Sequence, residues 1–126
     1  MTYRKLESSE QVNFSKVVDA KTGTEIVPVI IVDRFDLEMG KIACVRMVGF
    51  MNRAAVDISL LSGTVTFYSR TKGMLWQKGE SSGNFLRLSE SYIDCDMDTL
   101  LFCVDAMGPT CHLGTDSCFE EDNDTI

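Results

Sequence analysis

The chain has 126 residues, of which 44% are hydrophobic and 25% charged, and its formal net charge is −7. A chain of this length and composition forms one domain with a core that needs no disulfide bonds. The acidic balance argues against nucleic acids and anionic membranes, which bind basic faces, and no apolar run is long enough to span a bilayer. Five cysteines are an odd number, which favours metal binding over disulfides in a reducing compartment.

The first part of the chain predicts a polar leader followed by two strands. Residues 1–13 are mostly polar, so we expect them to add little to the core. They also lack the apolar segment of a secretion signal, from which we expect a cytoplasmic protein. Apolar runs at 26–33 and 42–51 predict strands, and residues 34–41 between them predict a turn or loop.

A helix is expected at residues 53–61. Asn52 is a favourable N-cap, and Gly63 stands where a glycine often ends a helix. Helical spacing predicts that the buried side of this helix carries Ala54, Ala55, Ile58 and Leu61.

The rest of the chain predicts mainly strands, separated by glycine-containing turns. These strands are expected at 64–70, 74–78, 84–94 and 99–106. The predicted fold class is therefore α+β, predominantly β: a compact β-rich single domain with one main helix. We expect the domain to cover residues 1–119 and residues 120–126 to form an acidic, disordered tail.

Three alternating carboxylates, Asp94, Asp96 and Asp98, form the first candidate site. In an extended chain they would share one face, with Cys95 on the other. Such oxygen ligands suit a hard, oxygen-loving metal cation. The motif is not an EF-hand loop, because glycine and glutamate are absent from its sixth and twelfth positions. A solvated acidic turn without a metal remains the alternative.

Three cysteines and the single histidine form the second candidate site. Cys95, Cys111 and Cys118 lack the close pair typical of zinc fingers, but three thiolates suit a catalytic zinc with one open position. His112 is either a fourth ligand of a closed structural site or, as we prefer, an acid/base beside the metal. The other two cysteines lie in apolar segments, where we expect buried small hydrophobes: Cys44 and Cys103.

Several motifs together resemble one enzyme family. They are FMN at 50–52, FYSR at 67–70, LWQKGESSGN at 75–84, DCDMD at 94–98 and CHLGTDSCF at 111–119. In this order and spacing, across roughly residues 26–119, the chain resembles phosphoribosyl-AMP cyclohydrolases, which open the adenine ring in histidine biosynthesis. FMN stands where the family usually has YMN, and CHLG replaces the usual CHTG, so Phe50 and Leu113 are departures.

The resemblance implies two metals, a catalytic residue and a partner chain. The zinc ligands would be Cys95, Cys111 and Cys118, and the magnesium ligands Asp94, Asp96 and Asp98. His112 would be the catalytic acid/base. Members of the family are homodimers with the active site at the subunit interface, so the ligands can come from both chains.

The expected reaction is hydrolysis of the N1–C6 bond of 1-(5-phosphoribosyl)-AMP to the phosphoribosyl-formimino imidazole carboxamide nucleotide. Zinc makes water a better nucleophile at neutral pH for such a step. Basic, hydroxyl and aromatic side chains near the GESSG loop are candidates for substrate binding: Arg70, Trp76, Lys78, Glu80, Ser81 and Ser82. The alternatives are a catalytically weakened family member or a non-catalytic module with a structural zinc.

Overall fold

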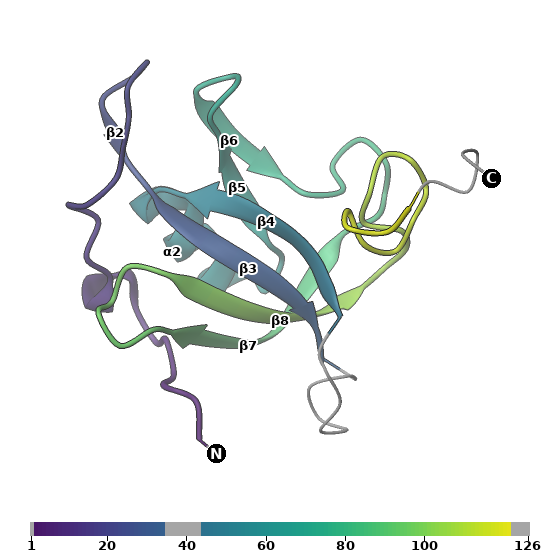
Figure 1. Ribbon diagram of the computed structural model, residues 1–126, viewed down its shortest axis with the longest axis horizontal. Helices are drawn as coiled ribbons and strands as arrows, with labels where there is room; N and C mark the ends of the chain where they lie inside the picture. The colour runs from purple at the N-terminus through teal and green to yellow at the C-terminus, as the bar shows by residue number, and fades with distance from the viewer. Residues whose placement is uncertain (1, 35–43, 122–126) are drawn as a thin grey trace.

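A four-stranded sheet forms the centre of the molecule. The computed structural model describes residues 2–34 and 44–121 (Figure 1). The strand order is β4-β3-β8-β7, in which β3 pairs with β8 in parallel and the outer pairs are antiparallel. The strands are β3 (Val27–Asp33), β4 (Val45–Met51), β7 (Leu86–Ile93) and β8 (Leu100–Ala106).

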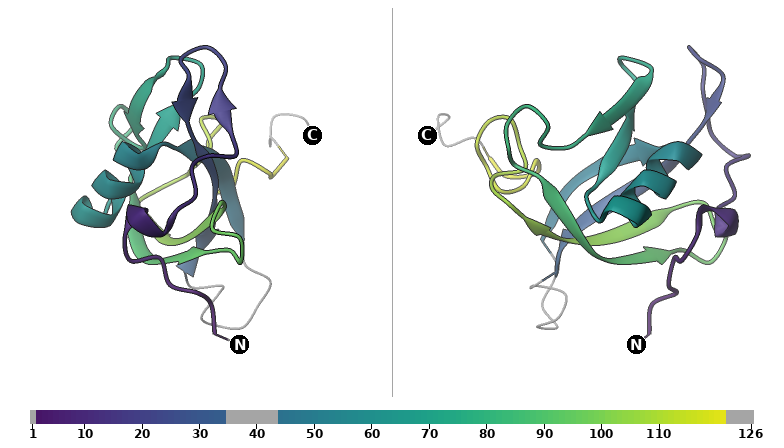
Figure 2. Two further views of the ribbon diagram at one scale, coloured as in Figure 1. Left: turned by 90° about the vertical axis from the view of Figure 1, so that its left-hand side faces the viewer. Right: turned by 180° about the vertical axis from the view of Figure 1, so that it is seen from behind.

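The remaining elements gather mainly on one face of this sheet. Helix α2 contacts β4 and β5, and Figure 2 shows it lying against the sheet beside the β5–β6 hairpin. These elements are α2 (Arg53–Ser62), β5 (Thr66–Ser69), β6 (Met74–Gln77), the short strands β1 (Val18–Asp19) and β2 (Thr24–Glu25), and the 3₁₀ turn η1 (Ser9–Gln11). The fold is thus β-rich with one main helix, as predicted.

The hydrophobic core lies between the sheet and this layer. Along β3, Val27, Val29 and Ile31 are buried, whereas the alternating Pro28 and Ile30 are only half-buried. This alternation is typical of a strand with one face in the core and the other outside it. The predicted strands at 26–33, 64–70, 74–78, 84–94 and 99–106 are confirmed with shorter bounds.

The caps of α2 are as predicted, but its buried face is not. The Asn52 side chain accepts a hydrogen bond from Ala55 N at 2.9 Å, and Gly63 adopts a left-handed conformation with φ of 76°. The buried residues are Ala55, Val56 and Ser59; Leu61, by contrast, is 91% exposed. Of the predicted face, Ala55 is buried as expected, but the prediction was wrong for Ala54, Ile58 and Leu61, which are exposed.

Ser59 can lie on the buried side of α2 because the fold places the backbone of Thr66 next to its hydroxyl group. Its hydroxyl accepts from Thr66 N at 2.9 Å and donates to Thr66 O at 3.2 Å. A buried hydroxyl with both bonds satisfied costs little, so a polar residue can face the core. The hydrophobic pattern of the helix could not reveal this.

The prediction for the N-terminal segment was also wrong. Leu6 and Val12 are 3% and 6% exposed and belong to the core. The backbone of this segment runs beside β7, where Leu6 N donates to Ser91 O and Ile93 N donates to Arg4 O, both at 2.9 Å. This pairing carries two isolated apolar side chains into the core.

The two cysteines that we expected to be buried differ in the structure. Cys103 is fully buried as expected, whereas Cys44, just before β4, is only half-buried. The predicted loop at 34–41 and the first residues of the predicted strand at 42–51 lie largely outside the described residues. Among the described residues, no helix is long and apolar enough to cross a membrane.

Candidate functional site

The three carboxylates meet in the turn between β7 and β8. One carboxylate oxygen from each of Asp94, Asp96 and Asp98 lies within 4.8 Å of the others. The segment is not the extended chain that the sequence analysis considered. Met97 has a φ of +64°, and Asp94 Oδ1 accepts hydrogen bonds from the backbone N–H groups of Asp98 and Thr99 at 3.0 and 3.1 Å. A curled turn therefore gathers the carboxylates, and Cys95 beside them is exposed.

A lysine from the N-terminal segment reaches this carboxylate cluster. Lys16 Nζ lies 2.7 Å from Asp98 Oδ2 and 3.2 Å from Asp96 Oδ2. Hydrogen bonding with the Asp98 carboxyl group, and then with Lys16, lowers the pKa of Asp96 to about 2. Three carboxyl groups facing one ammonium group leave an excess of negative charge, which suits a hard divalent cation. Magnesium binding here remains a prediction.

Two of the candidate zinc ligands lie together in the loop that follows β8, residues 110–118, named here the thiol loop. Within it Cys111 N donates to Thr115 O at 3.1 Å, and Gly114 N donates to Cys111 O at 3.0 Å. Gly114 has a φ of +91°, which an L side chain rarely adopts. This tight turn brings Cys118 back toward Cys111, close enough for each side chain to influence the pKa of the other.

The two thiols have opposite pKa shifts. The Leu113 N–H lowers the pKa of Cys111, with further help from the Thr115 and Cys118 side chains and from the charge of Lys78. Burial, followed by the nearby Cys111 charge, raises the pKa of Cys118. Of the two thiols, Cys111 therefore forms a thiolate more readily than Cys118. Thiolates are the ligands that zinc prefers.

A cavity of about 370 Å³ joins the thiol loop to the GESSG loop at 79–83. Cationic, hydroxyl, amide and imidazole groups come together there. Residues that line it include Trp76, Lys78, Ser81, Ser82, Asn84 and His112. Four of the six predicted substrate-binding residues therefore share one cavity with the thiol loop.

The other two predicted substrate-binding residues lie elsewhere. Glu80 is exposed and is not part of the lining. The Arg70 guanidinium stacks over the Phe50 ring, 4.1 Å from its centroid, and lines a separate cavity with Asp19. Trp76 lines the shared cavity but also packs on Phe67, with ring centroids 5.8 Å apart, so it is partly a core residue.

The third candidate zinc ligand does not reach the thiol loop within one chain. Among residues 2–34 and 44–121, the carboxylate cluster is the one group of three or more such ligands lying within 4.8 Å of one another. Cys95 lies in the turn before β8 and the thiol loop follows β8, so the two are at opposite ends of a seven-residue strand (Figure 1). Such a strand is about 20 Å long. A zinc site with all three cysteines remains a prediction that needs a second chain.

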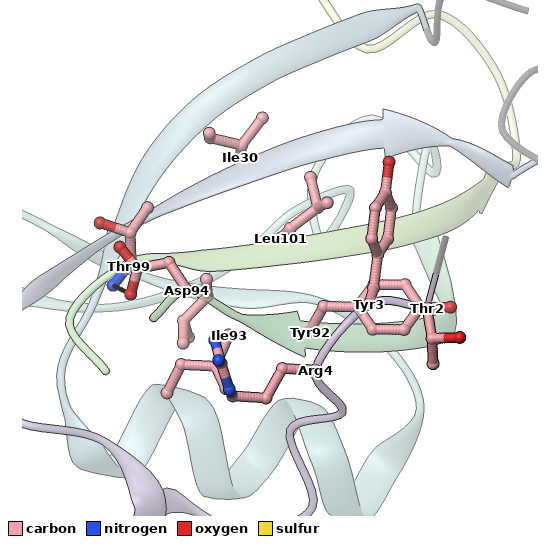
Figure 3. Close-up of a pocket in the computed structure, with 10 residues that line it drawn as sticks. Thr2, Tyr3, Arg4, Ile30, Tyr92, Ile93, Asp94, Thr99 and Leu101 are labelled. Atoms are coloured by element: carbon pink, nitrogen blue, oxygen red, sulfur yellow. Dashed lines mark hydrogen bonds between the residues drawn. The ribbon is translucent and has the colours of Figure 1, made fainter. Parts of the chain in front are cut away.

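The sheet face opposite α2 is apolar and hollowed. Ile30 of β3 lies opposite Val48 of β4 and Leu101 of β8, so all three share this outer face. A cavity of about 640 Å³ opens there (Figure 3), where Tyr3 packs edge-on against Tyr92 with ring centroids 5.2 Å apart. Asp94 and Thr99 line one end of this cavity, next to the carboxylate cluster.

Sequence reasoning missed several residues that the fold brings to these sites. Lys16 reaches the carboxylate cluster from 80 residues away in the chain. Arg46 reaches the thiol loop and is held there by Asp33, and Asn84 lines the cavity beside the loop. No local pattern marks the first three, whereas Asn84 lies at the end of the LWQKGESSGN motif and could have been included.

Comparison with known sequences gives one consistent result. Residues 47–120 match the profile of the phosphoribosyl-AMP cyclohydrolase family. This match contains the thiol loop, the carboxylate cluster and the cavity between the loops.

Similar proteins are named histidine biosynthesis bifunctional protein HisIE. The one from Photorhabdus laumondii is 59% identical over 75 residues, covering 60% of this chain and 37% of that protein. The one from Campylobacter jejuni is 47% identical over 115 residues, covering 91% of this chain and 50% of that protein. The chain therefore spans half or less of the length of these relatives.

Proposed function

This chain belongs to the phosphoribosyl-AMP cyclohydrolase family, and we propose that it hydrolyses the N1–C6 bond of 1-(5-phosphoribosyl)-AMP in histidine biosynthesis. One observation carries the proposal: a single cavity brings Lys78 and the GESSG loop together with His112 and the thiol loop. Groups that can bind a phosphate thus lie beside groups that can hold zinc and move a proton.

Phosphate binding is supported by the side of the cavity formed by the GESSG loop. Lys78 supplies a positive charge, and Ser81 and Ser82 supply hydroxyl donors. Gly79 and Gly83 have φ values of +96° and +79°, so the loop adopts conformations that suit glycine. Glu80 N and Gly83 N already donate to Gln77 O and Gly79 O, so the backbone donors that we propose for an anion are the N–H groups of Ser81 and Ser82.

The opposite side of the cavity supports the chemical step. The cysteine thiolates would hold zinc, which would supply polarisation of a water molecule. His112, exposed at the cavity, can take a proton from that water and deliver it to N1 as the C6–N1 bond breaks and the C6–O bond forms. The carboxylate cluster would hold magnesium, whose positive charge would offset part of the negative charge of a substrate phosphate.

We further propose a homodimer in which each zinc site takes ligands from both chains. The outer sheet face carries the apolar side chains Ile30, Val48 and Leu101, and Val48 is 48% exposed. Two copies packed through this face about a two-fold axis would bury these side chains. Because Cys95 and the thiol loop lie at opposite ends of β8, an axis that crosses β8 at right angles would bring Cys95 of each copy toward the thiol loop of the other. The reduced thiols that such a site requires are consistent with a cytoplasmic location.

The test is a spectrophotometric assay of ring opening with zinc-loaded protein and magnesium. We expect turnover that is lost in Cys111→Ser, and in His112→Ala we expect turnover to fall while zinc stays bound. Bound zinc without turnover in the unmodified chain would favour the non-catalytic module, and loss of zinc in His112→Ala would make His112 a ligand. A low turnover restored by Leu113→Thr would instead indicate a weakened family member.

Sharing of the zinc site between chains has its own test. Cys95→Ser and Cys111→Ser, each inactive alone, should recover activity when mixed, because a heterodimer contains one site with all its cysteines. Random exchange restores about a quarter of the sites. No recovery after proven subunit exchange would contradict the shared site.

A further inference from the structure

Strand β4 contains one residue more than its partner at a single point. Ile31 pairs with Met47, but the next residue of β3, Val32, pairs with Val45. Arg46 is therefore the extra residue of a β-bulge. A bulge leaves its extra residue outside the regular ladder and changes the direction of its side chain.

The bulge provides backbone contacts to the thiol loop. The carbonyl oxygen of Arg46 accepts a hydrogen bond from Cys118 N at 2.7 Å. The neighbouring carbonyl of Val45 accepts from the Ser117 hydroxyl group. The backbone around one of the two thiols is thus attached directly to the bulged part of β4.

The Arg46 side chain holds the same loop at two more points. Nη1 donates to Asp116 O at 3.0 Å and to Thr110 Oγ1 at 3.3 Å, one residue before Cys111. Nη2 and Nε donate to Asp33 Oδ2 at 2.8 and 3.3 Å, which orients the guanidinium from β3. The Arg46 side chain is only 13% exposed, so solvent screens these contacts weakly.

We propose that Arg46, oriented by Asp33, is the positioning residue that sets the spacing of the Cys111 and Cys118 thiols and thereby the zinc affinity of the thiol loop. The inference rests on the proposed zinc site. A planar guanidinium can contact the beginning of the loop, the end of the loop and Asp33 at once, whereas the single ammonium group of a lysine cannot. Residues that orient metal ligands typically change metal affinity by about 10- to 100-fold when they are replaced.

The experiment compares zinc affinity in the full chain, measured by competition with a chromophoric chelator. We expect Arg46→Met, which keeps the aliphatic stem, to weaken zinc binding by about 10- to 100-fold and Arg46→Lys to restore only part of the loss. Arg87→Met is the matched control, because Arg87 is exposed on β7 and its replacement makes the same charge change. This control should retain the original affinity.

Two further readouts separate positioning from general destabilisation. Cobalt substituted for zinc should show altered thiolate charge-transfer bands in Arg46→Met but unaltered bands in Arg87→Met. If Arg46→Met does not fold, Arg46→Lys and Asp33→Asn decide, and both should weaken zinc binding several-fold. If the folded Arg46 and Asp33 variants keep the zinc affinity of the wild type, the inference about Arg46 is overturned, but the proposed zinc site is not. A wild-type chain that binds no zinc overturns the proposed zinc site and this inference with it.

Discussion

The ammonium group of Lys16 lies 2.7 Å from a carboxylate oxygen of Asp98, across 82 residues of sequence. Hydrogen bonding with Asp98 and Asp96 raises the pKa of Lys16, so this group stays charged at neutral pH. Lys16 therefore serves as a built-in counter-ion of the carboxylate cluster.

Removing this counter-ion should strengthen magnesium binding. In Lys16→Met we expect Mg²⁺ affinity to rise roughly fivefold or more, because a positive charge next to the cation is lost. Titration calorimetry measures the change. Lys5→Met is the matched control, since Lys5 makes a looser surface pair with Glu90 at 3.6 Å. Equal affinities in both variants would show that the proximity of Lys16 is irrelevant.

The two thiols of the thiol loop should differ in reactivity when zinc is removed. The lowered pKa of Cys111 increases its thiolate fraction at neutral pH, and the raised pKa of Cys118 decreases its own. We expect iodoacetamide to modify Cys111 first across a series from about pH 6 to 9, as followed by peptide mass spectrometry. Lys78→Met should slow the reaction at Cys111 by removing a favourable charge. Earlier modification of Cys118 would contradict the assignment.

Two glycines of the GESSG loop should respond differently to alanine. Both have positive φ, but a Cβ at Gly79 would lie 2.5 Å from Phe85 N, whereas a Cβ at Gly83 meets nothing within 4 Å. Gly83→Ala should cost only the conformational term, about 1–2 kcal/mol. Gly79→Ala should cost clearly more and also reduce kcat/KM, because the loop must move. Urea unfolding measures the loss of stability, and the ring-opening assay measures kcat/KM. Equal losses of stability in the two variants would contradict the crowding at Gly79.

Asp19 should contribute a pH-dependent part of the stability. The Tyr68 hydroxyl donates to Asp19 Oδ2 at 2.9 Å and, together with the Lys21 N–H, lowers the pKa of this carboxyl group. Folding thus favours the charged form, so the contribution is complete above the unfolded pKa near 3.9 and is lost as the pH falls through the lowered folded value.

Asp19→Asn should therefore lower Tm at neutral pH, and its difference from the wild type should shrink as the medium becomes more acidic than about pH 4. Tyr68→Phe should remove part of the same pH dependence, since it deletes the main donor. Thermal unfolding followed by circular dichroism over this range checks both. A Tm difference that is independent of pH would contradict the linkage.

Features that depend on neighbouring residues could be predicted from the sequence. Asn52 and Gly63 marked the ends of α2 because a cap depends on backbone groups only a few residues away. A short, continuous apolar run marked β3, since a run of this length is typical of a strand. The same sequence motifs identified the family, which the match over residues 47–120 shows.

The arrangement of the site depended on contacts between distant segments. Lys16 and Asp96 are 80 residues apart, and Arg46 and Asp116 are 70 apart, so no pattern within either segment records the contact. Ser59 faces the core because Thr66 satisfies its hydroxyl group.

The sequence by itself determined the types of ligand: oxygen donors at 94, 96 and 98, and sulfur donors at 95, 111 and 118. The tertiary structure decided which of them meet. The turn after β7 curls the carboxylates together, and the bulge of β4 anchors the loop that pairs Cys111 with Cys118. The length of β8 separates that pair from Cys95, because a strand holds the residues at its two ends apart.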